Sequence, residues 1–515
     1  MQILRKFLPE IIVVPILLVV FFLTRLFNIL AVPMFTDEAI YTRWSQIARY
    51  DSNWRFISLT DGKQPAFVWI NMIFMRFFED PLLSGRIVSV LCGLFVVVGL
   101  YFLTVEVFRE NKKNRVIGLI ASALAIVYPF LLVYDRLALY ESMIAAFIVW
   151  SLYFQILLVR KLRLDLAMIT GLVMGGAVLT KSSGFLAMYL IPIIFFLYDF
   201  KKKGLKTNLL KAAGYFLVAV IIINVCYAIL RLSPFYHIIN QKNSIFVYDI
   251  GSWLKLATNI KIDILVSNSR GLFDWFFTYF TIPWVLLVFI AFFIKKEYLK
   301  EKALLFLWFM LPLLGLCFLG KTLYPRYLLF MTIPLIPLVA YSIWSLFSKL
   351  KNTMIRAILV LIVVALPLWL DYFILFDFAH APIPKLDLEQ LINGWPAGGG
   401  IRESVEFFEE KSKSGEIMVG TQGTFGLMPA AYEIYFRDNP NVRINGFWPV
   451  ESDKVPGLLL DYAQRIPTYF VFYQPCPTCA VAGIAPKTLN LKEVASYSKG
   501  AGNTKLTIYQ VFPSK

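Results

Sequence analysis

The chain has 515 residues, of which 59% are hydrophobic and 16% aromatic, and its mean hydropathy is +0.68. Only 16% of the residues are charged, against about 25% in ordinary globular domains, which excludes a soluble globular protein. Most of the net charge of +17 sits in short basic loops between apolar runs, so nucleic-acid binding need not be invoked. The composition therefore predicts a polytopic α-helical membrane protein.

Apolar runs near the ~20 residues needed to span hydrocarbon recur between Ile11 and Phe376. We expect about eleven spans, at residues 11–31, 86–108, 116–133, 142–159, 165–181, 184–198, 212–231, 276–294, 303–319, 327–347 and 355–376. The first run lacks a small-residue cleavage site, which favours a retained anchor. Residues 1–376 are thus predicted to form a multi-span domain, and the polar residues 377–515 a soluble domain.

The loops predict the orientation, because positive charge near helix ends marks the cytoplasmic side. Basic residues gather at the N-terminus and in the loops at residues 109–115, 160–163, 201–206, 295–302 and 349–356. All of these loops are cytoplasmic only if one apolar segment before residue 108 does not cross. Residues 65–78 are short and carry Asn71 and Arg76, which favours an interfacial helix within an outer loop at residues 32–85. We therefore expect a plasma (inner) membrane protein with a cytoplasmic N-terminus and an extracytoplasmic C-terminal domain.

This topology gathers ionisable residues that are distant in sequence at the outer membrane surface: Asp37, Glu38, Lys63, Arg86, Asp135, Arg136, Glu141, Lys181, Lys321 and Arg326, with Tyr324. Such gathering at one boundary predicts a site, whereas a transporter more often places these groups near the bilayer midplane. Each residue also has a structural alternative. Thr36 suits an N-cap with Asp37 and Glu38 in the first helical turn, Arg86 suits snorkelling to the interface, and Lys181 suits the cap of a tight turn. In "GKTLYPRYLLF", Lys321 and Arg326 are spaced to hold a phosphate.

Six short motifs follow one another along this surface: "TDEAIYTRW", "DGKQPAFVWI", "SGRIVSVLCG", "VYDRLALYESMIAAF", "LTKSSGF" and "YPRYLLFMTIP". Their order resembles that of the GT-C glycosyltransferases of the protein O-mannosyltransferase and lipid A aminoarabinose transferase type. The resemblance implies transfer of a monosaccharide from a polyprenyl phosphate donor to an acceptor hydroxyl of a protein, lipid or polysaccharide at the outer face.

By match of position, the resemblance implies that Asp37 is the catalytic base, that Glu38 positions the acceptor or the sugar, and that Asp135 is a second catalytic acidic residue. The implied contacts to donor phosphate and sugar are Lys63, Arg86, Lys181, Lys321, Tyr324 and Arg326. Inverting displacement needs one base, and the departing polyprenyl phosphate needs cations rather than a general acid.

The chain departs from the family pattern in ways that leave the donor sugar open. Lys63 and Gln64 stand where the family often has His, and Glu141 stands where an Asp is common. The chain has only two histidines, so we predict no metal and no other cofactor, with divalent coordination by Asp37 and Asp135 as the alternative. The alternative functions are a transporter or flippase for polyprenyl-linked glycans, and a structural component of a surface-assembly complex.

The C-terminal segment predicts a small α/β domain. Helix signals occur in "RESVEFFEEKSK", and apolar β-branched runs occur in "EIMVGT", "VRING", "TYFVFYQ" and "TKLTIYQVF". The glycines of "PAGGGIRESVEFF" favour a flexible entry to a helix over an anion site. Cys476 and Cys479 favour a local disulfide over two free thiols, because the exterior is oxidising.

Overall fold

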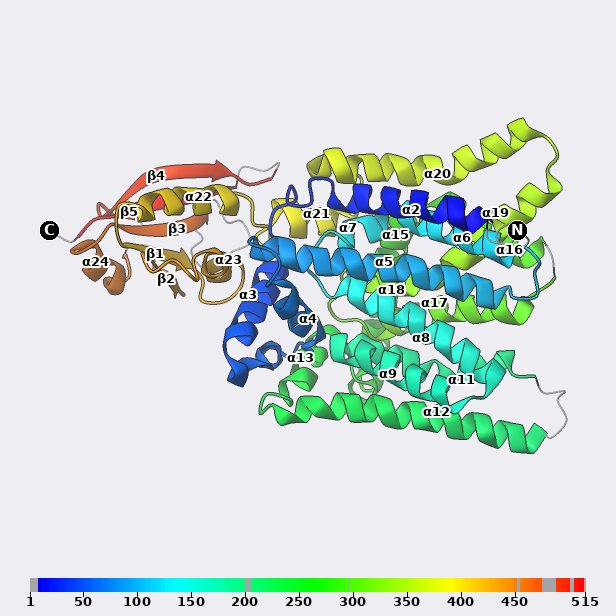
Figure 1. Ribbon diagram of the computed structural model, residues 1–515. Helices are drawn as coiled ribbons and strands as arrows, with labels where there is room; N and C mark the ends of the chain where they lie inside the picture. Colours follow the sequence, from blue (N-terminus) through cyan, green and yellow to red (C-terminus); the bar gives the residue numbers. More distant parts are fainter. Residues whose placement is uncertain are drawn as a thin grey trace.

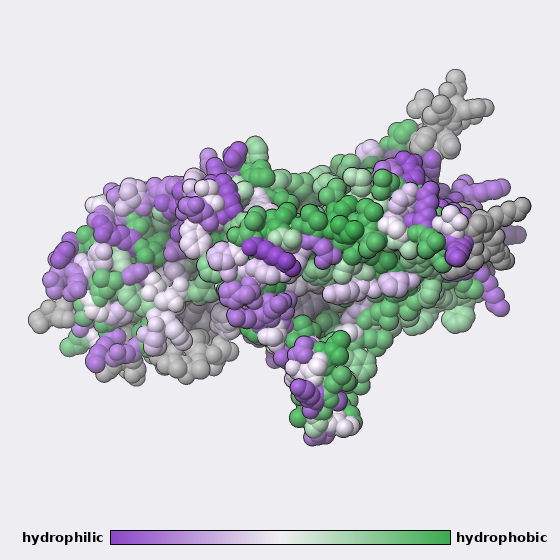
Figure 2. All heavy atoms as spheres, turned by 90° about the horizontal axis from the view of Figure 1, so that it is seen from below, coloured by the Kyte–Doolittle hydropathy of each residue, from purple (hydrophilic) through white to green (hydrophobic). Residues whose placement is uncertain are grey.

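The computed structural model describes residues 8–199, 205–294, 296–451, 454–474, 488–500 and 504–513. Cys476 and Cys479, and the basic residues 201–203 and 295, lie outside the described residues. A helical bundle carries a small α/β domain at one end, and the two chain termini lie at opposite ends of the molecule (Figure 1). Figure 2 shows hydrophobic side chains over most of the bundle surface and a more polar surface on the α/β domain. This division fits a membrane-embedded bundle, since exposed apolar surface on that scale needs a lipid partner.

The described bundle consists mainly of apolar helices: α2 (Leu8–Leu26), α5 (Pro81–Val107), α6 (Asn114–Ile126), α7 (Pro129–Tyr134), α8 (Glu141–Lys161), α9 (Leu164–Thr180), α12 (Leu205–Ala228), α17 (Leu299–Leu319), α19 (Ile336–Lys349) and α20 (Thr353–Phe376). Short helices α10 (Leu186–Tyr189), α11 (Ile191–Ile194) and α18 (Leu329–Thr332) complete it. Six described stretches are long and apolar enough to cross a bilayer, at residues 81–107, 141–161, 206–232, 299–319, 325–349 and 353–376. The expected total of about eleven spans stays a prediction.

The segment between the expected spans at residues 212–231 and 276–294 is largely helical. It contains α13 (Ile238–Phe246), α14 (Ile250–Leu254) and most of α15 (Thr258–Phe280). The expected span at residues 276–294 is broken, because α15 meets α16 (Ile282–Phe293) at an angle of 91°. Thr281 lies at the break with φ 61°. Pro283 lies in the first turn of α16, where its missing amide hydrogen is tolerated, whereas inside a continuous helix it would break the hydrogen-bond ladder.

The expected outer loop at residues 32–85 contains two α-helices at the end of the bundle nearest the α/β domain (Figure 1). Helix α3 (Thr36–Tyr50) begins at Thr36 itself, and the Glu38 carboxylate accepts a hydrogen bond from the Phe35 amide at 2.9 Å. Helix α4 (Ala66–Phe74) lies within the helix expected at residues 65–78, and its place at the membrane interface stays a prediction. The side-chain amide of Asn71 on α4 is buried. It donates to the Ser45 hydroxyl on α3 and accepts from the Ser84 hydroxyl on α5, which joins the three helices.

The C-terminal domain is the predicted small α/β fold, with a five-stranded sheet in the order β2-β1-β3-β5-β4. Its elements are α21 (Lys385–Leu388), α22 (Ile401–Ser412), β1 (Ile417–Gln422), α23 (Leu427–Tyr435), β2 (Val442–Phe447), α24 (Gly457–Ala463), β3 (Thr468–Gln474), β4 (Leu491–Ser498) and β5 (Lys505–Val511). Strand β1 pairs parallel with β2 and β3, whereas β5 pairs antiparallel with β3 and β4. The sequence predicted four of these strands and missed β4, an edge strand with a mostly exposed, polar pattern.

The α/β domain is fastened to α3, the helix that carries Asp37. The Thr36 amide and hydroxyl both donate to the Pro396 carbonyl, at 2.9 and 2.8 Å. Further along α3, Arg43 pairs with Glu433 at 2.8 Å, on helix α23. Gly398 lies so close to this junction that a Cβ would sit 2.5 Å from the Met34 carbonyl oxygen. Close packing therefore requires glycine there.

Candidate active site

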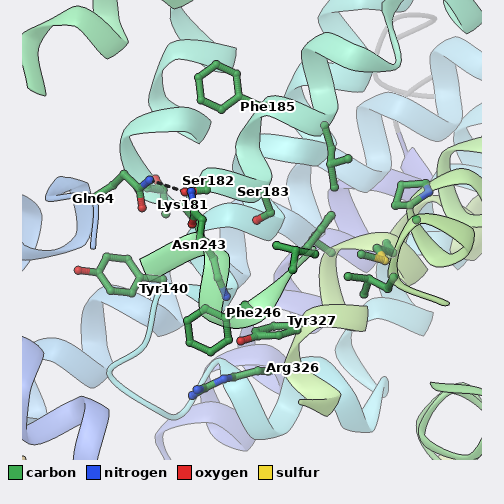
Figure 3. Close-up of a pocket in the computed structure, with 18 of the residues that line it drawn as sticks. Gln64, Tyr140, Lys181, Ser182, Ser183, Phe185, Asn243, Phe246, Arg326 and Tyr327 are labelled. Atoms are coloured by element: carbon green, nitrogen blue, oxygen red, sulfur yellow. Dashed lines mark hydrogen bonds between the residues drawn. The ribbon is translucent and has the colours of Figure 1, made fainter. Parts of the chain in front are cut away.

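A cavity of about 650 Å³ lies among segments that are far apart in sequence. Its walls come from the loop after η2 (Ile57–Asp61), the start of α8, the turn after α9, helices α13 and α17, and the turn before α18. Figure 3 shows Lys181, Arg326 and Tyr327 close together in this cavity, near Asn243 and Phe246 of α13. Several of the polar sequence motifs therefore contribute to one cavity.

Arg326 links the two acidic motifs at the polar end of the cavity. Its Nη1 lies 3.0 Å from Asp37 Oδ2, and its Nε lies 3.8 Å from Glu141 Oε1. Lys181 Nζ also contacts Glu141 Oε1, at 2.9 Å. The side chains of Asp37 and Arg326 are 22% and 10% exposed, so this ion pair is partly accessible. Arg326 lines the cavity, whereas Asp37 lies just outside the lining and is joined to it through Arg326.

The charge around Asp37 keeps it ionised. Burial raises the pKa of the Asp37 carboxyl, but the positive charges of Arg326, Lys63 and Lys181 outweigh burial and hold that pKa below its ordinary value. Asp37 is therefore an acceptor-only carboxylate at neutral pH, which is the protonation state that a general base requires.

Lys63 supplies a cation without a carboxylate partner. Its Nζ lies 5.3 Å from the centre of the Phe246 ring and forms no ion pair with any described residue. Burial lowers the pKa of Lys63 to about 8, while Asp37 raises it. The preceding Gly62 has φ +67°, and a Cβ there would lie 2.6 Å from the Lys242 Cβ. An incoming anion would meet an amine whose charge is not already neutralised.

The turn after α9 brings Lys181 to the cavity by a close backbone approach. A Cβ on Gly184 would lie 2.3 Å from the Ala177 carbonyl oxygen, so only glycine fits this turn. The Gln64 amide donates to the Ser182 hydroxyl at 2.7 Å and joins the turn to the loop of Lys63 (Figure 3). The Lys181 amine also lies 4.8 Å from the Tyr327 ring centre.

The other end of the cavity is apolar. It is lined by Phe185, Leu186, Leu190, Leu311, Leu316, Leu319, Leu323, Phe330 and Met331. Two lining residues on its rim, Tyr189 and Leu311, are 64% and 40% exposed on the bundle surface. The cavity thus joins a cationic end to an apolar end that reaches the lipid-facing side of the bundle.

Glu38 and Arg86 lie outside this cavity lining and form a fully buried pair. Arg86 Nε and Nη2 bind the two Glu38 oxygens at 2.9 and 2.8 Å, and both side chains are 0% exposed. The Ala138 amide donates to Glu38 at 2.6 Å, while Arg86 also donates to the Ile29 carbonyl. This geometry supports a positioning role, with Glu38 holding the second acidic loop against the first.

Asp135 is likewise buried, and its oxygens contact Arg25 at 3.4 Å and the Ser142 hydroxyl at 2.7 Å. It does not line the cavity, whereas Glu141 does. Lys321 lies outside the lining and donates to the Ser244 carbonyl. Tyr324 also lies outside the lining, with its ring centre 5.0 Å from Arg326.

Glu141 was among the residues gathered at the predicted surface, but the sequence prediction gave it no catalytic or binding role. Its position at the start of α8 was visible in the sequence, but the choice between Asp135 and Glu141 depends on partners such as Arg25, more than a hundred residues away. Among the described residues, no group of three or more His, Cys, Asp or Glu side chains is placed to hold a metal ion. Metal independence stays a prediction.

The fold of this chain is similar to the folds of two solved transferases. The chain is similar to the crystal structure of ArnT from Cupriavidus metallidurans in the apo state, with a TM-score of 0.60, 13% identity and 97% of each chain covered. It is also similar to the Archaeoglobus fulgidus oligosaccharyltransferase, with a TM-score of 0.51, 15% identity, and 89% of this chain and 67% of that chain covered.

The sequence adds a closer assignment for part of the chain. Residues 62–227 match the family model for dolichyl-phosphate-mannose-protein mannosyltransferase. The match covers less than half of the chain, and together with the shared fold it agrees with the resemblance that the motif order indicates. A comparison with curated proteins gave no significant match.

Proposed function

We propose that the chain transfers a monosaccharide from a polyprenyl phosphate donor to an acceptor hydroxyl at the outer membrane face, with inversion and with Asp37 as the base. The observation that carries this proposal is the two-ended cavity. Lys63, Lys181 and Arg326 suit a phosphate, and the apolar wall suits a long isoprenoid chain. The ArnT structure solved with undecaprenyl phosphate supports such a donor, because its fold matches this chain with a TM-score of 0.59.

The proposed reaction needs one proton transfer and one displacement. Asp37 takes the proton of the acceptor hydroxyl, and the acceptor oxygen attacks the anomeric carbon from the face opposite the phosphate. The bond between that carbon and the phosphate oxygen breaks, and the polyprenyl phosphate leaves with its electron pair. Lys63 and Lys181 stabilise the added negative charge, as preorganised cations do where charge develops.

Arg326 would connect base and leaving group. In the structure it binds Asp37 and has Glu141 as a second neighbour. A donor phosphate in the cavity would draw on the remaining hydrogen-bonding capacity of its planar guanidinium, which presents five donors. Asp37 and the leaving phosphate would then be held by one rigid group.

The direct test uses purified protein in lipid nanodiscs with a panel of polyprenyl phosphate monosaccharides. We expect one donor to be consumed, with transfer to lipid, protein or polysaccharide acceptors followed by mass spectrometry. Asp37→Asn should bind that donor but not consume it. Failure of the wild-type protein to consume any donor, even with membrane extracts as the acceptor source, would refute the proposal.

The proposed orientation has its own test. Positions 53 and 112 are both exposed, and lie in the first outer loop and in the expected inner loop between α5 and α6. In intact cells, a cysteine at position 53 should react with an impermeant thiol reagent and a cysteine at position 112 should be protected. The reverse pattern would place the cavity on the cytoplasmic side and contradict the proposed location of transfer.

A further inference from the structure

Asp387 is a buried carboxylate to which the sequence analysis gave no role. It lies on α21, in the segment that joins the last bundle helix to the α/β domain, and it is 0% exposed. Its two oxygens accept hydrogen bonds from two different bundle helices, from the Tyr134 hydroxyl at 2.9 Å and from the Tyr279 hydroxyl at 2.6 Å. One carboxylate therefore ties α7 and α15 to the base of the outer domain.

Tyr134 is the residue at which the second acidic loop begins. The loop that follows it contacts Arg25 through Asp135, Glu38 through the Ala138 amide, and Lys181 through Glu141. Tyr279 lies at the end of α15, a helix that packs against the turn carrying Arg326. Asp387 thus hydrogen-bonds to Tyr134, just before the loop that leads to Glu141, and to Tyr279, on the helix that packs against the Arg326 turn.

The charge of Asp387 also reaches this cluster. The pKa of Asp387 is raised to about 6, mainly because the carboxyl is buried. The hydroxyls of Tyr279 and Tyr134 and the charge of Arg326 act to lower this pKa, and the charge of Glu141 acts to raise it. These four groups, on α15, α7, the Arg326 turn and α8, are the polar and charged neighbours that act on Asp387. At neutral pH the carboxylate is mainly ionised, so its negative charge acts on Arg326 in addition to the charges of Asp37 and Glu141.

We propose that Asp387 is a positioning residue for transfer, which holds Tyr134 and Tyr279 and offsets part of the positive charge that Arg326 presents to Asp37. This inference rests on the proposed function, because it assigns Asp387 an effect on the proposed base. Its consequence is specific. Removing the Asp387 charge leaves Asp37 in a more positive field, which lowers the pKa of Asp37 and makes it a weaker base.

The test compares Asp387→Asn with wild type, using the donor found in the panel experiment. Asn has the same size and keeps one oxygen that can accept a tyrosine hydroxyl, so the fold should persist. We expect kcat at neutral pH to fall about three- to tenfold with donor KM unchanged. In wild type, kcat should also fall as the pH is lowered through about 6, where Asp387 loses its charge, and Asp387→Asn should lack this step. Tyr134→Phe and Tyr279→Phe should keep the step but move it to higher pH, because each removes a hydrogen bond that lowers the pKa of Asp387.

Asp371→Asn is the matched control. Asp371 is another buried carboxylate, 7% exposed on α20, and its electrostatic partner is Arg25 rather than Arg326. It should leave kcat and the step near pH 6 unchanged. A folded Asp387→Asn enzyme with wild-type kcat and an unchanged step would overturn the inference while leaving the proposed function intact. Full transfer by Asp37→Asn would instead overturn the proposed function, and this inference with it.

Discussion

The charged residues of this protein form two neighbouring layers, which differ in how deeply they are buried and how completely they are paired. In the inner layer, the Glu38–Arg86 and Arg25–Asp135 pairs are 0% exposed, and Glu38 is bound by a guanidinium and two backbone amides. In the cavity layer, the Arg326–Asp37 pair is partly exposed and Lys63 pairs with no described carboxylate.

The contrast separates adjacent residues, Asp37 and Glu38, into different roles. A saturated buried pair resists change, because removing one partner leaves a desolvated charge. A partly exposed pair with unused donors can exchange partners at low cost, as binding and proton transfer require. We therefore expect the inner layer to govern folding and the cavity layer to govern chemistry.

The largest expected effect is on Asp37. Asp37→Asn removes the proposed base, and general-base catalysis contributes about 10² to 10⁴ in rate. Turnover should fall by that factor, while thermal stability and donor binding stay near wild type, because Asn still accepts a hydrogen bond from Arg326. Purified Asp37→Asn enzyme that keeps more than about a tenth of wild-type turnover would remove Asp37 from the mechanism.

The next largest effect is expected in the inner layer, on the stability contributed by Arg86. Arg86→Met leaves the Glu38 carboxylate buried without its cation, which costs about 3 to 5 kcal/mol of stability. We expect low yield and a clearly lower unfolding temperature in detergent. The double variant Glu38→Gln with Arg86→Met should recover much of this loss, since no charge is left unpaired. Normal stability of Arg86→Met would mean that the buried pair does not hold the two acidic loops.

A smaller effect compares two cations of one motif. Arg326→Ala removes a charge-assisted contact worth about 1.5 to 3 kcal/mol, so donor affinity should fall roughly tenfold or more. Lys321→Ala, five residues earlier but outside the cavity lining, should change donor affinity far less. Equilibrium binding of the labelled donor to both variants measures this. Equal losses would show that the donor phosphate lies nearer the membrane surface than the cavity indicates.

The smallest effect is a pH dependence. Because the pKa of Lys63 is lowered to about 8 in the free protein, its charge is present below that pH and is lost as the pH rises through it. Donor affinity should therefore weaken above about pH 8. Lys63→Arg keeps its charge at higher pH, so its donor affinity should remain level there. An equal decline in both proteins would exclude Lys63 as the titrating group.

Local pattern predicted much of the fold, because long apolar runs and β-branched strands carry their own signal. It predicted α4 and four of the five strands, but not the helical content of residues 238–275, where polar and apolar residues mix. It placed the acidic and basic motifs on one surface without separating the two layers. Asp37 and Glu38 are adjacent on α3 but face different partners. These partners lie 289 and 48 residues away in the sequence, so local pattern could not assign the two carboxylates to different layers. Asp387 had no local signal at all.

Under the proposed function, the apolar end of the cavity, which includes the exposed Tyr189 and Leu311, means that the donor enters sideways from the surrounding leaflet. For such an enzyme the relevant donor concentration is a mole fraction in two dimensions, not a molarity in water. Adding inert lipid or detergent at fixed donor and protein should slow turnover by surface dilution. An apparent KM quoted per litre would then vary with membrane content, whereas one quoted per lipid molecule would not.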